Sequence, residues 1–271
     1  MNILLVASIA IALYILATAR LGFRFSASAQ QISGGIDLKM LLPGCLALLF
    51  HAIVLYQLIN TSSGLNMGFY NALSLVSWVI ALLVLLSTLI KPTENLAMII
   101  FPATAVTLLL EYLFPSTRIV VENGSFGLDL HIIFSIAAYS LLSIAALQAV
   151  ILAFQEHQLR AKHPVSVMRR LPPMQTMEEL LVQLLWVGFF LLSLGLASGM
   201  MFIHNLFGQN LSHKTVLSIL AWLFFGLVLF GRTIWGWRGK YLVRFTLSGF
   251  ALLMLAYFGP KFVYELILQR V

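Results

Sequence analysis

Four of the six histidines in this chain lie within or at the ends of long apolar runs, where an imidazole can act as a metal ligand. They are His51, His131, His204 and His213. Ionisable side chains are costly inside a membrane and usually face a partner or a cavity. A neutral imidazole costs less than a charge, and its lone pair can coordinate a metal, including haem iron. Two such rings on facing helices can hold a planar macrocycle between them.

Each of these histidines also has a structural interpretation. His131 can cap the start of its run or pair with Asp129, and His51 can hydrogen-bond a neighbouring helix. His204 and His213 lie near the ends of their runs, where polar residues are common. A bare zinc site is the rival metal interpretation. It is less favoured because no cysteine or carboxylate stands at short ligand spacing from these histidines.

The composition predicts a membrane protein. The chain has 271 residues, of which 61% are hydrophobic and 9% charged, whereas soluble domains carry about 25% charged residues. No stretch is long enough for a separate soluble domain, so we predict a single membrane domain over residues 1–271. The net charge of +7 is then attributed to topology and not to a nucleic-acid partner. The single cysteine, Cys45, excludes an intramolecular disulfide and a CxxC motif.

The elements that must position the histidines are apolar runs long enough to cross a bilayer. We expect an all-α transmembrane bundle of about eight spans, with the lipid bilayer as its surroundings. The runs cover roughly residues 3–19, 40–59, 69–90, 96–114, 130–154, 180–207, 215–235 and 242–268.

The basic residues predict the orientation of these spans. The first run is followed, not preceded, by Arg20 and Arg24, which favours a retained first span with its N-terminus outside. With that orientation, twelve of the sixteen basic residues fall on the inner side. The long loop at about 155–175 becomes a basic cytoplasmic loop, and both termini lie outside. His157 and His163 fall in this loop and are interpreted as solvated residues.

This topology places the four candidate histidines at a shared depth, in the outer leaflet or at its surface. His131 begins the fifth span, and His213 begins the seventh. Haem held there requires cations near its propionates, and the outer-side candidates are Lys214, Arg118 and Lys261.

Other polar residues also fall inside the predicted spans. Glu111 can bond a neighbouring helix or belong to an ion or proton path. Asn71, Ser74 and Ser77 follow helical spacing on the third span and are predicted to hydrogen-bond between helices.

The chain resembles the cytochrome c assembly membrane protein family, the CcsA/CcmC/HemX group, and most closely its small YpjD-like inner-membrane branch in Gram-negative bacteria. The resemblance covers nearly the whole length. Its segments are Leu130-His131 through Tyr139, His213 through Trp222, Gly231-Arg232, Gly236 through Lys240, Gly249-Phe250, Tyr257 through Gly259, and Asn71 through Trp78.

The resemblance implies haem handling at the outer face of the membrane, with histidine ligands, and His131 stands where the synthase branch has its first external haem histidine. Three synthase features are missing: the tryptophan-rich loop between spans six and seven, the late second external histidine, and the buried histidine before Arg232. The HemX-like branch is similar in lacking them and is linked to regulation of the haem pathway. The resemblance therefore implies a protein that is not an enzyme.

The first hypothesis is a haem-binding protein of the bacterial inner membrane that assists or regulates haem handling and cytochrome c biogenesis, together with proteins of those pathways. His131 and His213 are the expected axial pair, with His51 and His204 as a second pair or as support. A second hypothesis is a transporter or transport-associated subunit that uses Glu111 and the histidines on a cation or proton path. A third is an adaptor that binds a soluble partner through its basic inner loop.

Overall fold

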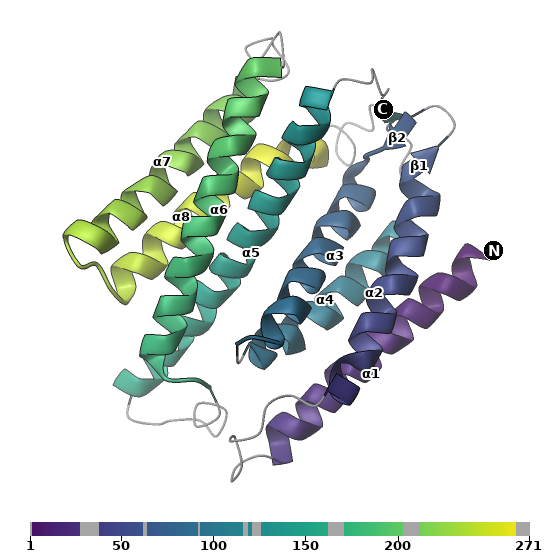
Figure 1. Ribbon diagram of the computed structural model, residues 1–271, viewed down its shortest axis with the longest axis horizontal. Coiled ribbons are helices and arrows are strands. Elements are labelled where there is room, and N and C mark those ends of the chain that lie inside the picture. Colours follow the sequence, from purple (N-terminus) through teal and green to yellow (C-terminus); the bar gives the residue numbers. More distant parts are fainter. Residues whose placement is uncertain are drawn as a thin grey trace. The chain divides into compact units, whose positions relative to one another are not determined.

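The computed structural model describes residues 2–27, 38–61, 64–91, 93–115, 119–120, 126–161, 171–202 and 212–263. Within these residues, eight helices are long and apolar enough to cross a membrane, as the sequence predicted (Figure 1). They are α1 (Ile3–Ala27), α2 (Leu38–Ile59), α3 (Phe69–Thr88), α4 (Glu94–Leu113), α5 (Phe126–Arg160), α6 (Met174–Phe202), α7 (Ser212–Ile234) and α8 (Lys240–Lys261).

Most of these helices have the length that a bilayer requires. A helix rises 1.5 Å per residue, so about 20 residues match a hydrocarbon core of about 30 Å. Helices α5 and α6 are longer, with 35 and 29 residues. The predicted start of the inner loop at Gln155 was wrong, because α5 continues to Arg160 and carries His157 in its last turns. The remainder of that loop, including His163, lies outside the described residues.

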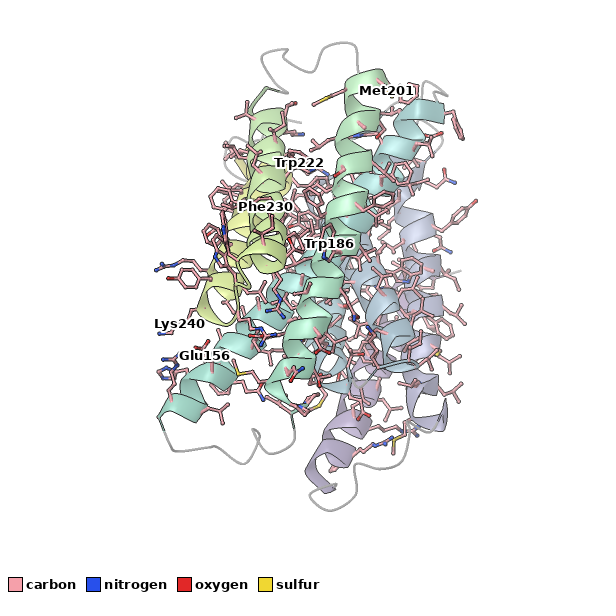
Figure 2. The ribbon with its side chains drawn as sticks, turned by 60° about the vertical axis from the view of Figure 1, so that its left-hand side comes forward. Glu156, Trp186, Met201, Trp222, Phe230 and Lys240 are labelled. Atoms are coloured by element: carbon pink, nitrogen blue, oxygen red, sulfur yellow. The ribbon has the colours of Figure 1, made fainter. Side chains whose placement is uncertain are left out.

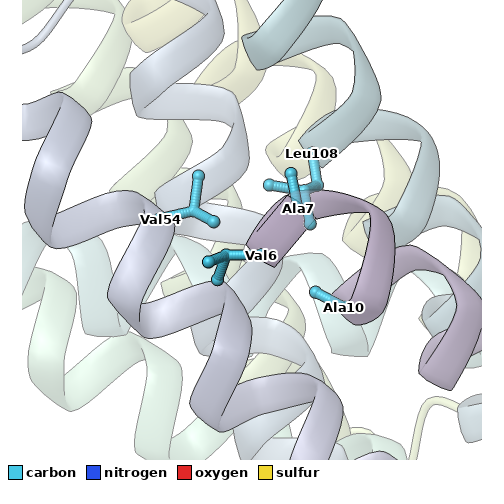
Figure 3. Packing of buried hydrophobic residues seen from close by; sticks show 5 residues of the cluster. All are labelled: Val6, Ala7, Ala10, Val54 and Leu108. Atoms are coloured by element: carbon cyan, nitrogen blue, oxygen red, sulfur yellow. The ribbon is translucent and has the colours of Figure 1, made fainter. Parts of the chain in front are cut away.

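The described chain divides into two compact units, Met1–Glu122 and Asn123–Arg270. In the first unit, α1 packs against α2 and α4, and α3 packs against α2 and α4. Small and branched side chains let these helices approach closely. One cluster joins Val6, Ala7 and Ala10 of α1 to Val54 of α2 and Leu108 of α4 (Figure 3).

A small antiparallel sheet also belongs to the first unit and was not predicted. Its strands are β1 (Asn60–Thr61), β2 (Gly64–Asn66) and β3 (Ile119–Val120), in the order β1-β2-β3. Leu65 pairs with Asn60 on one side and with Val120 on the other. Strands of two or three residues are too short to show an alternating pattern in the sequence. The sheet joins the end of α2 to the segment after α4.

In the second unit, α5 packs along α6, α7 packs along α8, and α5 also contacts α8. Glycines on α6 make the α5–α6 approach possible, because a Cβ atom on Gly188 would lie 2.7 Å from the Leu142 side chain. Gly195 and Gly199 continue this stripe toward the end of α6, facing Ser135 and His131. Small residues of this kind are typical of helix interfaces in membranes.

Candidate functional site

His131 lies near the beginning of α5, and α6 holds its ring in place. The Nδ1 atom is 2.8 Å from the carbonyl oxygen of Gly195. A carbonyl oxygen can only accept, so Nδ1 carries the proton and Nε2 keeps its lone pair. Among the described residues, Nε2 has no hydrogen-bond partner. This is the arrangement of many metal-binding histidines, which donate one ring N–H to a carbonyl and bind the metal through the other nitrogen.

Glycine provides the space for this ring. A Cβ atom on Gly199 would lie 3.0 Å from Cε1 of His131 and 3.1 Å from Nδ1. The Ser198 hydroxyl is 3.5 Å from Nδ1 and donates to the Gly195 carbonyl at 2.9 Å. The sequence analysis missed Gly195, Ser198 and Gly199, although the Gly-x-x-x-Gly spacing was a readable signal of close helix approach. The pairing of His131 with Asp129 is not among the contacts of the described residues.

Several other candidates lie at the same end of the second unit. The chain runs up and down through α5 to α8, so the beginning of α5 and the end of α6 share one end with the beginning of α7 and the end of α8 (Figure 1). His213 and Lys214 belong to the first turn of α7. Lys261 ends α8, is 8% exposed, and lies over the Tyr257 ring at 5.1 Å. Only the backbone of His213 is described.

Aromatic rings pack between α5 and α8 in the second unit. Tyr139 of α5 lies within 5.5–5.8 Å, between ring centroids, of Phe250, Tyr257 and Phe258 of α8. Such rings form the apolar, polarisable surroundings that a macrocycle favours. Tyr139 lies about two helical turns further along α5 than His131.

His51 has a different environment, in the first unit. It is fully buried, its Nδ1 is 3.2 Å from the Tyr14 hydroxyl, and its Nε2 is 2.9 Å from the Ser74 hydroxyl. Both ring nitrogens are therefore engaged, one as donor and one as acceptor. The interhelical bonds predicted for Ser74 and Ser77 are confirmed, because Ser77 bonds Thr107 of α4 at 2.6 Å. Asn71 instead bonds the nearby Asn66 carbonyl.

Glu111 of α4 is the acidic neighbour of this group. It is 1% exposed, and neither carboxyl oxygen has a hydrogen-bond partner within the described ranges. The Ser74 hydroxyl of α3 lies near enough to interact with the carboxyl, but outside hydrogen-bonding geometry. Tyr14, His51, Ser74 and Glu111 thus bring one polar side chain from each of the four helices of the first unit. Burying a carboxyl group without a hydrogen-bond partner destabilises the folded state. Glu111 is therefore better explained by a function than by a contribution to stability.

The remaining candidates have the following positions. His204 and Arg118 lie outside the described residues. His51 belongs to the first unit and His131 to the second. Ligation of one haem iron by both histidines therefore stays a prediction. In the part of the chain that the structure describes, no group of three or more His, Cys, Asp or Glu side chains is arranged to hold a bare metal ion.

Comparison with known proteins places the chain in a family. The family model described as "Cytochrome C assembly protein" matches residues 40–268. The chain belongs to the cytochrome c assembly protein family.

Relatives agree with this assignment. "Inner membrane protein YpjD" of Escherichia coli K12 is 33% identical over 239 residues, covering 88% of this chain and 90% of the relative. An "Uncharacterized 28.8 kDa protein" of Azospirillum brasilense is 37% identical over 153 residues, 55% of this chain and 56% of the relative. "Cytochrome c biogenesis protein CcsA" of Prochlorococcus marinus is 33% identical over 79 residues, 28% of this chain and 25% of the relative. No solved structure shows a significant match.

The resemblance seen in the sequence is confirmed, both for the family and for the YpjD-like branch. Together with the eight apolar helices of the described structure, the relationship identifies a multi-pass protein of the inner membrane. The family relationship associates the chain with cytochrome c assembly.

Proposed function

We propose that this protein binds haem at the periplasmic side of the inner membrane and assists or regulates haem handling during cytochrome c biogenesis. It acts with proteins of those pathways and makes or breaks no covalent bond itself. The observation that carries the proposal is the His131–Gly195 contact, which leaves Nε2 of a membrane histidine with an unused lone pair. Membership of the cytochrome c assembly family supports the same choice of ligand.

The residues at this end of the second unit fit haem by their chemistry. Nε2 of His131 would hold the haem iron, and His213 in the first turn of α7 is proposed as the second histidine ligand. Lys214 and Lys261 are the proposed propionate partners. Arg118, which belongs to the first unit and lies outside the described residues, is proposed as a third from its place in the sequence alone. Bound haem would supply a redox-active iron. The protein's part is to orient the ring and to shield it from water with apolar side chains.

His51 and His204 are proposed as a second pair or as support. For His51 the support is indirect, because Tyr14 and Ser74 already occupy both of its ring nitrogens. Its most direct contribution is to hold α1, α2 and α3 together.

The proposal is tested with an absorbance spectrum of the purified full-length protein, before and after addition of haem. We expect a Soret band that His131→Ala removes and His213→Ala weakens strongly. His157→Ala is the matched control, because His157 lies on the same helix but at its opposite end. A protein without a Soret band after haem addition contradicts the proposal, as does a band of equal strength in His131→Ala.

Transport is the second candidate function, and Glu111 is the observation that favours it. A fully buried carboxyl without a partner among the described residues, beside the Ser74–His51–Tyr14 chain, is the kind of group that takes up a proton or a cation inside a membrane. In this case Glu111→Gln abolishes proton or cation flux in reconstituted vesicles, whereas haem has no effect on the flux. Unchanged flux in Glu111→Gln removes this candidate.

A further inference from the structure

A second polar site lies at the other end of the second unit, away from His131. A pocket of about 530 Å³ opens between the last turns of α5 and the first turns of α8. Its polar lining comes from Glu156, His157 and Arg160 of α5 and from Lys240 and Arg244 of α8. Glu156 and Lys240 lie close to each other in Figure 2, where the two helices meet.

The pocket carries excess positive charge. Arg160 is already engaged, because two of its nitrogens lie 2.7 and 3.1 Å from Oε1 of Glu156. Lys240 and Arg244 are exposed, and within the described ranges neither has an ion-pair partner. The pair Glu156–Arg160 is neutral as a whole, so the charges of Lys240 and Arg244 remain to attract an anion.

The α8 side of the pocket is held in place before any ligand binds. Gly239 precedes α8 with a φ of +53°, a backbone conformation that residues other than glycine rarely adopt. Its backbone N–H donates to Oε1 of Glu178 on α6 at 2.8 Å, and Glu178 is 7% exposed. A buried carboxylate therefore fixes the start of α8 against α6, and the two cations of α8 are presented from a rigid frame.

The depth of the pocket suits the headgroup of a lipid. Helix α8 has 22 residues, or about 33 Å, close to the thickness of the hydrocarbon core. Lys240 at its first position thus lies at the boundary where lipid phosphates are found. Apolar side chains continue from the pocket into the membrane, with Val150 and Ala153 before His157 on α5, and Ala251 and Leu255 beyond Arg244 on α8. They leave an apolar surface for acyl chains.

We propose that this pocket binds the phosphate of an anionic membrane phospholipid, with Lys240 and Arg244 as the contacts that select negative charge. Basic pockets between helix ends are a known means of holding anionic headgroups. Arginine suits phosphate because its planar guanidinium can donate two parallel hydrogen bonds. The bound lipid bridges α5 and α8 at the end of the unit opposite the candidate haem site. The inference does not depend on haem binding.

Native mass spectrometry of the full-length protein in a zwitterionic detergent tests this proposal. The protein is titrated with phosphatidylglycerol, with phosphatidylcholine as the lipid that has a phosphate but no net charge. We expect saturable binding of phosphatidylglycerol and at least tenfold weaker binding of phosphatidylcholine. Lys240→Gln and Arg244→Gln should each weaken phosphatidylglycerol binding about fivefold, and Arg244→Lys should retain most of it.

The matched control is Arg20→Gln, which removes an exposed arginine from the last third of α1 in the other unit. Equal weakening in Arg20→Gln overturns the proposal, because it reduces the effect to general surface charge. Binding that no substitution in the pocket changes overturns it too. Competition with inorganic phosphate distinguishes a lipid phosphate from free phosphate. If inorganic phosphate binds with the same affinity as the lipid and displaces it, the pocket is a site for free phosphate and the lipid proposal is overturned. If Arg244→Gln does not fold, Lys240→Gln alone serves as the test variant.

Discussion

The ring of His131 on α5 is held by α6, because its Nδ1 atom lies 2.8 Å from the carbonyl oxygen of Gly195. Gly199 lies one helical turn further along α6, where a Cβ atom would approach Cε1 and Nδ1 of the same ring to 3.0 and 3.1 Å. The packing of α5 against α6 therefore sets the orientation of the ring. Small substitutions on α6 should change the position of Nε2.

Gly199→Ala should reduce haem affinity about tenfold, because groups that orient a metal-binding histidine commonly have effects of that size. The added Cβ would lie 3.0 Å from the ring, so the imidazole must move by a few tenths of an ångström. Haem titration followed by absorbance measures the change. Gly226→Ala on α7 is the control, since its Cβ would make an ordinary contact at 3.5 Å from Phe189. Equal affinities in the two variants would contradict the prediction.

The two described membrane histidines should differ in their contribution to stability. His51→Ala leaves the Tyr14 and Ser74 hydroxyls unpaired and opens a cavity between three helices, at a cost of about 2–4 kcal/mol. His131→Ala removes a single bond to a carbonyl, worth about 1 kcal/mol. Thermal unfolding of the haem-free protein in detergent compares them. The assignment of His51 to a structural role fails if His131→Ala is the more destabilising change.

Glu111→Met should raise the apparent Tm of the purified protein. Met fills a similar volume, and it removes a buried carboxyl whose two oxygens have no described partner. An unsatisfied buried polar group costs about 1–3 kcal/mol. Gln148→Met is the contrast, because Gln148 is equally buried and its Oε1 also has no described partner, but its Nε2 donates to the Met177 carbonyl at 3.3 Å. Gln148→Met should raise the Tm less than Glu111→Met, or lower it. A lower Tm in Glu111→Met would contradict the prediction and show that the carboxyl has a stabilising partner.

Gly231→Ala should destabilise the second unit by about 1–3 kcal/mol, because extra volume in a packed site forces neighbours to move. A Cβ atom there would lie 2.3 Å from the Trp237 ring, which stacks on Phe245 at 4.9 Å between centroids. Thermal unfolding and a change in tryptophan fluorescence report the displacement of Trp237. Gly226→Ala on the same helix should leave both unchanged, and a silent Gly231→Ala would count against this packing.

The orientation in the membrane remains a prediction from charge and can be tested with one cysteine at a time. In a Cys45→Ser background, Phe126→Cys at the start of α5 should react with a membrane-impermeant maleimide added to intact spheroplasts. Ala161→Cys, just after α5, should react only after lysis. Both positions are exposed. The reverse pattern would place His131 at the cytoplasmic face and would remove the periplasmic haem site.

Some of these features could be read directly from the order of the residues. Hydropathy is a sum over neighbours in the chain, so the eight spans were predictable, and their family was recognisable from short segments such as Leu130-His131 and Gly236 through Lys240. Charge distribution predicted a basic cytoplasmic loop at about 155–175, which stays a prediction. The exact ends of helices were less accessible, as His157 shows, because a polar last turn looks like a loop when only hydropathy is considered.

Residue order alone determined that this protein crosses the membrane many times, and it singled out histidines within the spans and at their ends as candidate ligands. Tertiary structure decided how those histidines differ: His51 has both nitrogens engaged by α1 and α3, whereas His131 keeps Nε2 available because α6 binds only Nδ1. It also decided that Lys240 and Arg244 meet the end of α5 in one pocket. The physical reason is that a hydrogen bond or a pocket depends on which helices pack together, and residues far apart in the chain meet only through that packing.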